Sequence, residues 1–232
     1  MQTVITEEVK KVDKFERFLR QVDILKPETC IIPIFIIGAG ATGSFVALSL
    51  AKMGFEDIRV WDEDKVEEHN FPNQIFPIEA KGQNKATALQ KIVEQFTEVK
   101  IDAVPLFYTN QPVKGIVISC VDSMKIRKKI YTNALKTKDK VKLIIDPRTG
   151  PELFRVITTD INSEAQCKYY ESTLHSDAEA DETPCTARAI IYSVLAVSAF
   201  ICKQVKAHCM NQEFAQDLLM DMRNDVLLTL KK

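Results

Sequence analysis

A glycine-rich turn between an apolar run and an amphipathic segment constrains this chain more than any other feature. The run IIPIFII, residues 31–37, leads into Gly38, Gly40 and Gly43, which fit the spacing G-x-G-x-x-G, and apolar residues then recur at helical intervals up to Gly54. Glycines allow the backbone to turn tightly and approach a phosphate, while the N-terminus of the following helix presents free N–H groups. The pattern predicts a strand, a nucleotide-binding turn and a helix.

The remainder of the chain repeats this alternation of strand and helix. Apolar runs bounded by turn residues predict strands, and apolar residues three or four apart predict helices. Further strands are expected at residues 57–62, 100–107, 114–122, 141–146 and 152–160, and further helices at 84–96, 123–136, 186–207 and 213–230. The predicted fold class is α/β, a Rossmann-like, mainly parallel sheet with helices on both faces and C-terminal helices. The polar stretch at about 162–184 is expected to be a mobile crossover loop.

Length and composition indicate one sizeable core. The chain has 232 residues, 46% of them hydrophobic, and a net charge of -1, which gives no support for nucleic acid as a partner. We expect an N-terminal helical arm over residues 1–30 and a single nucleotide-binding domain over residues 31–232. The N-terminus lacks an apolar signal region, and the apolar stretch at 189–202 is too short to span a bilayer. A cytoplasmic protein without membrane contact is therefore expected.

Polar residues at the ends of the predicted strands are candidates for nucleotide binding. Asp62 lies 24 residues after Gly38, where an acid accepts hydrogen bonds from ribose hydroxyls. Asp64 is either a second nucleotide ligand or a solvated turn residue. Lys85 is either a phosphate-binding cation or a surface lysine, and Asp122 either holds magnesium or caps the helix that follows. These residues suit a dinucleotide or a triphosphate, and their spacing does not choose between the two.

The order of the motifs is more specific than any one of them. GAGATGS, WDEDKVEEHNFPNQIF, GQNKA, SCVDS with Arg127, and PCTARAI resemble the ThiF/MoeB/ubiquitin-activating superfamily from roughly Phe15 to Ala207, and RFLRQVDIL, from Arg17, is similar to its opening motif. The resemblance implies binding of ATP with Mg²⁺ and adenylation of the C-terminal carboxylate of a small ubiquitin-like protein or peptide, commonly by a homodimer. Cys167 stands alone where relatives carry a zinc-binding Cys-x-x-Cys, so no zinc is expected.

The resemblance also implies roles for single residues. The phosphates are expected at the three glycines, the ribose at Asp62, and Mg²⁺ at Asp122. Lys85 is expected to neutralise phosphate charge, and Arg20 to reach the ATP of the neighbouring subunit. The residues implied to bind the nucleotide are Gly38, Gly40, Gly43, Asp62, Asp64, Asn70, Gln74 and Lys85, and those implied to be catalytic are Arg20, Lys85, Asp122 and Cys185.

Two positions leave the chemistry open. Asn73 stands where the superfamily has an arginine, so an adenylating enzyme would lose a cation unless Lys81 or Arg148 replaces it. Cys185 precedes the long apolar helix, where a thiol at a helix N-terminus is either an activated nucleophile or a passive loop residue.

Three alternatives therefore stand beside adenylation of a small protein. The first is a catalytically weakened partner subunit or scaffold. The second is an NAD-dependent oxidoreductase, which explains neither Arg20 nor the pair Lys85 and Asp122. The third is a relative that acts on tRNA, which the charge balance does not encourage.

Overall fold

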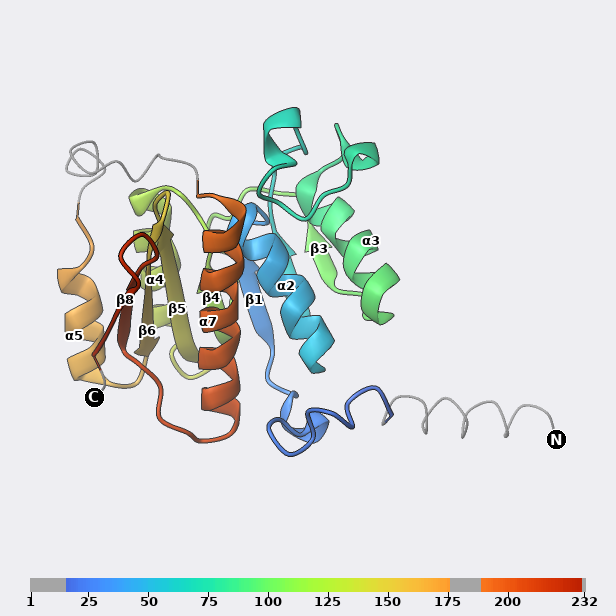
Figure 1. Ribbon diagram of the computed structural model, residues 1–232. Helices are drawn as coiled ribbons and strands as arrows, with labels where there is room; N and C mark the ends of the chain where they lie inside the picture. The colour runs from blue at the N-terminus through green and yellow to red at the C-terminus, as the bar shows by residue number, and fades with distance from the viewer. Residues whose placement is uncertain (1–15, 176–188, 231–232) are drawn as a thin grey trace.

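The computed structural model of the chain describes residues 16–175 and 189–230, which form an eight-stranded sheet covered by helices (Figure 1). Its helices are α2 (Ala41–Met53), α3 (Lys85–Thr97), α4 (Met124–Lys136), α5 (Glu164–Ser172) and α7 (Ile191–Cys209), with short 3-10 helices at Pro27–Thr29, Glu68–Asn70 and Ile78–Ala80. Its strands are β1 (Ile34–Ile37), β2 (Ile58–Trp61), β3 (Asp102–Val104), β4 (Gly115–Ser119), β5 (Val141–Thr149), β6 (Leu153–Asp160), β7 (Asp217–Asp221) and β8 (Val226–Leu230).

The strand order is β3-β2-β1-β4-β5-β6-β7-β8. The first five of these strands are parallel, and β5 to β8 are joined by antiparallel pairs. Ile37, at the end of β1, is in register with Trp61 of β2 and Ser119 of β4. The loops that follow β1, β2 and β4 therefore meet at one edge of the sheet, which is where open α/β sheets bind ligands.

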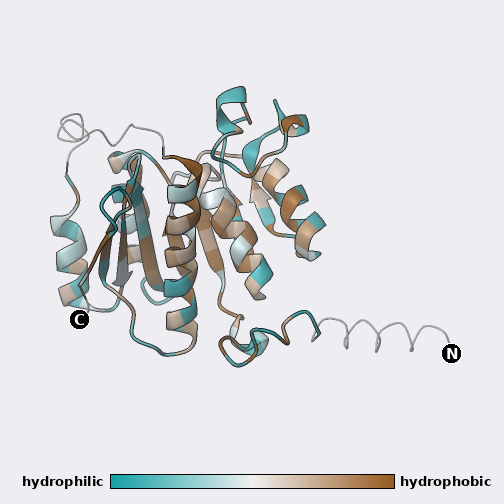
Figure 2. Cartoon of the chain, in the orientation of Figure 1, coloured by the Kyte–Doolittle hydropathy of each residue, from teal (hydrophilic) through white to brown (hydrophobic). Residues whose placement is uncertain are grey.

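The core lies on both faces of this sheet, as predicted. Along β1, Ile34 and Ile36 pack into one hydrophobic cluster together with α2, α3 and α7, whereas Phe35 and Ile37 pack into a second cluster with α4 and α5. Since successive side chains of a strand point to opposite faces, a strand buried on both sides is apolar throughout. Figure 2 shows this as hydrophobic central strands between helices whose outer surfaces are more hydrophilic.

The helix predicted over residues 213–230 is wrong, because this segment forms the hairpin of β7 and β8. Asp221 pairs with Val226 across the turn. The Asp221 carboxylate accepts hydrogen bonds from the backbone N–H groups of Arg223 and Asn224, and Asp225 has a left-handed φ of 55°. The apolar residues of the segment also fit helical spacing, but β7 pairs with β6. This pairing satisfies the backbone of the strand, and no local signal reports it.

The predicted crossover loop also contains regular structure. Residues 164–172 form α5, with Ser163 as its N-cap: its hydroxyl accepts a hydrogen bond from the backbone N–H of Gln166. The rest of the loop lies largely in residues 176–188, outside the described part of the chain. The apolar helix predicted over 186–207 is confirmed as α7, Ile191–Cys209.

The segment before the sheet was predicted as a helical arm. Residues 17–24 form successive turns, and Pro27–Thr29 form a 3-10 helix. Among the described helices, none has the length and apolar character that crossing a membrane requires.

Candidate functional site

The glycine turn joins β1 to α2 and combines two packed glycines with one open one. Gly38 has a φ of +99°, and a Cβ built on it lies 2.3 Å from the carbonyl oxygen of Cys120. A Cβ on Gly43 lies 1.9 Å from the carbonyl oxygen of Gly38. Gly40, the N-cap of α2, has no atom within 4 Å of its Cβ position. The side of the turn at Gly40 is therefore open to a ligand at the helix N-terminus.

Asp62 ties this turn to the end of β2. One carboxylate oxygen accepts a hydrogen bond of 2.6 Å from the Ala39 backbone N–H, and the other accepts one of 2.9 Å from the Asp64 backbone N–H. Burial raises the pKa of Asp62, and these two hydrogen bonds and the charge of Lys85 oppose the rise. Each oxygen keeps a second lone pair, so Asp62 is still able to accept a hydrogen bond from a hydroxyl group.

Lys85 lies beside Asp62, at the first residue of α3. Its side chain is only 11% exposed, and its ammonium group is 2.9 Å from an oxygen of Asp64. Asn84 caps α3, and its amide donates to the carbonyl oxygens of Asp62 and Asp64. Lys85 is therefore not a surface lysine. A buried ammonium group beside the glycine turn is suited to an anionic ligand.

The loop that carries Asn70 and Gln74 is held by its own backbone. Asn70 is buried and accepts a hydrogen bond of 2.8 Å from the Glu67 backbone N–H, and its carbonyl oxygen accepts one from the Gln74 N–H. The side-chain oxygen of Gln74 is buried and has no hydrogen-bond partner among the described residues. Such an oxygen is costly to leave unpaired, so a donor from a ligand or a water molecule is expected there.

Asn73 has a structural partner. Its side-chain amide donates a hydrogen bond of 3.0 Å to the carbonyl oxygen of Ala189, two residues before α7 begins. The two cations considered as replacements for an arginine at this position are engaged elsewhere. Lys81 pairs with Glu68 at 2.6 Å, and Arg148 donates to the backbone and side-chain oxygens of Thr173, at the end of α5.

Asp122 lies at the same edge of the sheet, just after β4. The N-cap of α4 is Ser123, whose hydroxyl accepts a hydrogen bond from the Ile126 N–H, so the alternative in which Asp122 only caps this helix is wrong. Asp122 is exposed, and its negative charge stabilises the charged form of the buried Arg127. The Cys120 N–H donates to the carbonyl oxygen of Ile37, which places the loop of Asp122 next to the glycine turn.

A buried ionic cluster supports this edge from behind. Arg127 of α4 donates to Asp146 of β5 and to the carbonyl oxygens that end β4 and follow it, and Asp146 also accepts from Arg148 and Tyr170. Burial lowers the pKa of Arg127 to about 10. In the sequence, Arg127 stands out only as part of a motif, and Asp146 does not stand out at all, because nothing local marks a carboxylate that pairs 19 residues away.

Arg20 is not brought to this site. Arg17, on the same segment, donates to the Thr97 carbonyl oxygen at 3.1 Å and pairs with Glu98, and Gln21 donates to the Met53 carbonyl oxygen at 2.8 Å. These contacts hold the segment at the C-terminal ends of α2 and α3. The glycine turn lies at the other end of α2, a helix of 13 residues and about 20 Å.

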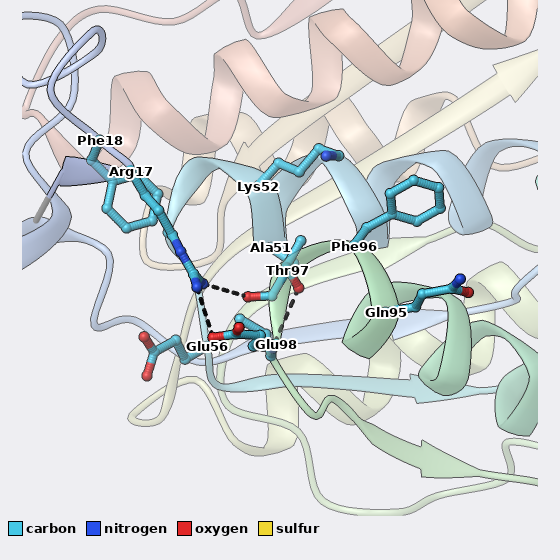
Figure 3. A pocket seen from close by; sticks show the side chains of 11 residues that line it. Arg17, Phe18, Ala51, Lys52, Glu56, Gln95, Phe96, Thr97 and Glu98 are labelled. Atoms are coloured by element: carbon cyan, nitrogen blue, oxygen red, sulfur yellow. Dashed lines mark hydrogen bonds and ion pairs between the residues drawn. The ribbon is translucent and has the colours of Figure 1, made fainter. Parts of the chain in front are cut away.

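A cavity of about 400 Å³ also lies at this far end, as Figure 3 shows. Among the residues that line it are Arg17, Phe18, Lys52, Gln95, Phe96 and Glu98. The cavity is separate from the loops that follow β1, β2 and β4, so it is not the predicted nucleotide site.

Cys185 lies outside the described residues. Burial raises the pKa of Cys120 and of Cys202 to about 12, so neither thiol is a ready nucleophile. No group of three or more His, Cys, Asp or Glu side chains within residues 16–175 and 189–230 is arranged to hold a metal ion.

Known proteins resemble this chain in sequence and in fold. The sequence model of the ThiF family matches residues 32–217. The adenylyltransferase and sulfurtransferase MOCS3 of Dictyostelium discoideum is 30% identical over 127 residues, which are 50% of this chain and 29% of that protein. The chain thus spans less than a third of the length of this curated relative.

Solved structures share the fold. PaaA superposes with a TM-score of 0.73 at 16% identity, over 95% of this chain and 74% of that one. MccB of E. coli, in a structure with ATP, gives a TM-score of 0.69 at 12% identity, over 88% of this chain and 65% of MccB. A further structure of MccB contains AMPCPP and MccA.

Proposed function

This chain belongs to the ThiF family, and on that premise we propose that it adenylates the C-terminal carboxylate of a small ubiquitin-like protein or peptide. The observation that carries the proposal is the meeting of three features at one edge of the sheet: the open side of the turn at Gly40, the buried Lys85, and the exposed Asp122. A triphosphate needs a phosphate cradle, a cation and a magnesium-holding acid. A nicotinamide dinucleotide needs only the first of these.

The reaction proposed is transfer of AMP. An oxygen of the substrate carboxylate attacks the α-phosphorus of ATP, the bond from that phosphorus to the bridging oxygen of the β-phosphate breaks, and pyrophosphate leaves with the electron pair. The nucleophile is already ionised, so no general base is required. The barrier comes from bringing one anion against several, and Lys85 and the N-terminus of α2 lower it by offering positive charge.

Asp122 fits the magnesium ion that such a reaction uses. Mg²⁺ prefers oxygen ligands and takes one or two carboxylates together with phosphate oxygens. An exposed carboxylate at the carboxyl end of a parallel strand meets this need. When bound, the ion would neutralise phosphate charge as pyrophosphate leaves.

The finer parts of the proposal rest on the family and its relatives. MccB has been solved with ATP and with MccA, which supports a nucleotide and a second partner for this chain. Transfer from the adenylate to Cys185 remains a prediction. A homodimer in which Arg20 serves the neighbouring subunit also remains a prediction, supported by the position of Arg20 at the far end of its own α2.

One observation favours a second candidate, a catalytically weakened partner subunit. Asn73 replaces the arginine of the family motif and is engaged with Ala189. Nucleotide binding without adenylation is the behaviour that distinguishes this candidate.

The first test is binding of Mg-ATP by isothermal titration calorimetry, with NAD titrated in parallel. We expect Mg-ATP to bind and Asp122→Asn to raise its dissociation constant by about tenfold or more, because a carboxylate ligand of the metal is lost. Asp139→Asn, an exposed acid beyond the other end of α4, is the matched control and should change nothing.

Tight binding of NAD without binding of Mg-ATP would overturn the proposal. If Mg-ATP binds and Asp122→Asn weakens it, release of pyrophosphate with ubiquitin-like substrates then separates the enzyme from the weakened partner.

A further inference from the structure

The outer surface of α4 and the turn after it form a strongly basic face. Residues 123–142 contain eight basic side chains and a single acid, Asp139. Arg127 is buried in the cluster behind the site, and Lys142 lies in β5, where its charge acts on His208 of α7, on the other side of the sheet. The other six are exposed lysines. We call these six the lysine face: Lys125, Lys128, Lys129, Lys136, Lys138 and Lys140.

The lysine face is unneutralised. None of its six ammonium groups forms an ion pair with the residues that the structure describes, whereas Lys81, Lys114 and Lys168 each pair with an acid. The whole chain has a net charge of -1, so the rest of the chain is acidic in balance. The positive charge is therefore concentrated on one surface, where it creates a local field that a neutral total conceals.

This face begins at the candidate site. α4 starts two residues after Asp122, and Lys125 lies in its first turn. From Lys125 to Lys136 the helix extends about 17 Å away from the site. A tail of about six extended residues covers about 20 Å, so a small domain lying on α4 is able to place its C-terminus beside Asp122.

The chemistry of the face indicates the kind of partner. Lysine offers a flexible point charge rather than the rigid fork of arginine, which suits a diffuse anionic surface. The exposed side chains of α4 include no aromatic ring on which a nucleotide base could stack, since Tyr131 is buried. A long polyanion would extend from the lysine face over the acidic remainder of the molecule and be repelled there, whereas a small acidic domain would not.

We propose that the lysine face docks the acidic surface of the small protein whose C-terminal carboxylate is activated at the site. This inference rests on the proposed function and adds to it a surface and a charge for the substrate. Docking there would raise the rate of encounter through attraction at a distance and would leave the tail free to enter the site.

The test uses poly-L-glutamate with a free C-terminus as an acidic polypeptide probe, followed by fluorescence anisotropy at low salt. The triple variant Lys128→Gln, Lys129→Gln, Lys136→Gln should bind the probe about tenfold more weakly than the wild-type chain. The matched control changes three exposed lysines elsewhere, Lys26→Gln, Lys100→Gln and Lys203→Gln, and should stay within about twofold of wild type.

Binding of Mg-ATP to the same variants separates this inference from the proposed function. It should be unchanged in both triples, and an unchanged value would also show that both are folded. Equal loss of probe binding in the two triples, or no binding to the wild-type chain, would reject the lysine face while leaving the proposed function in place. Tighter binding of a DNA duplex than of poly-L-glutamate at the same salt would assign the face to nucleic acid and overturn the inference. Failure of the wild-type chain to bind Mg-ATP would remove its premise.

Discussion

At the scale of single residues, the three glycines of the turn differ in whether a side chain would fit. Gly38 and Gly43 have no room for a side chain because carbonyl oxygens lie where a Cβ would be. Gly40 has the room and an ordinary φ of -74°. Packing therefore does not require glycine at position 40, and the open space beside it is where the proposed phosphates would lie.

Alanine at two of these positions should separate folding from binding. Gly40→Ala should lower the free energy of unfolding by only about 1 kcal/mol, the usual cost of alanine at an N-cap. It should still weaken Mg-ATP binding by about tenfold or more, because the methyl group blocks the approach of the phosphates. Gly43→Ala should cost more than about 3 kcal/mol by overpacking. Urea unfolding and calorimetry measure the two effects, and unaltered Mg-ATP binding in Gly40→Ala would contradict a ligand there.

Asn73 should matter for stability through Ala189. Asn73→Asp keeps the size of the side chain but removes the donor and sets an acceptor against the Ala189 carbonyl oxygen. The free energy of unfolding should fall by about 1–3 kcal/mol, the usual result of an unpaired acceptor. Asn110→Asp, on an exposed loop, is the control and should cost little. Equal urea midpoints for the two variants would show that the bond to Ala189 is not formed in solution.

At the scale of elements, the carboxylate of Asp217 links β7 to β6 and to α5. Asp217 of β7 accepts hydrogen bonds from Arg155 of β6 at 3.0 and 3.1 Å, and another from Tyr169 of α5. Burial alone would raise the pKa of Asp217, but the hydrogen bonds from Arg155 and Tyr169 outweigh it and lower the pKa. The ionised form is therefore the one that the folded state favours.

This gives a pH dependence with a definite sign. The stability from Asp217 should be fully present above its ordinary pKa of 3.8 and lost as the pH falls through the lower pKa of the folded state. Asp217→Asn should cost about 1 kcal/mol at neutral pH, a modest value because Arg155 is partly exposed to solvent. Urea unfolding should show the difference shrinking below pH 3.8. Asp57→Asn, which breaks an exposed pair with Lys114, should show almost none, and a constant difference for Asp217→Asn at every pH would refute the linkage.

At the scale of the whole molecule, the carboxyl ends and the amino ends of the parallel strands have different roles. The edge after β1, β2 and β4 gathers the open turn, Lys85 and Asp122, with the buried cluster of Arg127 and Asp146 behind it. The opposite edge holds the N-terminal segment against the ends of α2 and α3. Because α2 spans the distance between them, a residue of that segment such as Arg20 is far from the turn of its own chain.

The sequence by itself determined the parts of this protein that depend on neighbouring residues. The strand, turn and helix around Gly38 follow from steric needs of a few consecutive residues, and the alternation of apolar runs indicated the parallel sheet with helices on both faces. The order of motifs indicated the family, because several short patterns in one order rarely arise together.

Only the tertiary structure decided what depends on distant partners. The segment of β7 and β8 has apolar residues that suit a helix or a hairpin, and pairing with β6 selected the hairpin. The bond of Asn73 to Ala189 spans 116 residues, and the cluster of Arg127 with Asp146 joins a helix to the following strand. The packing of the whole chain determines contacts of this kind, and a local sequence pattern carries no information about them.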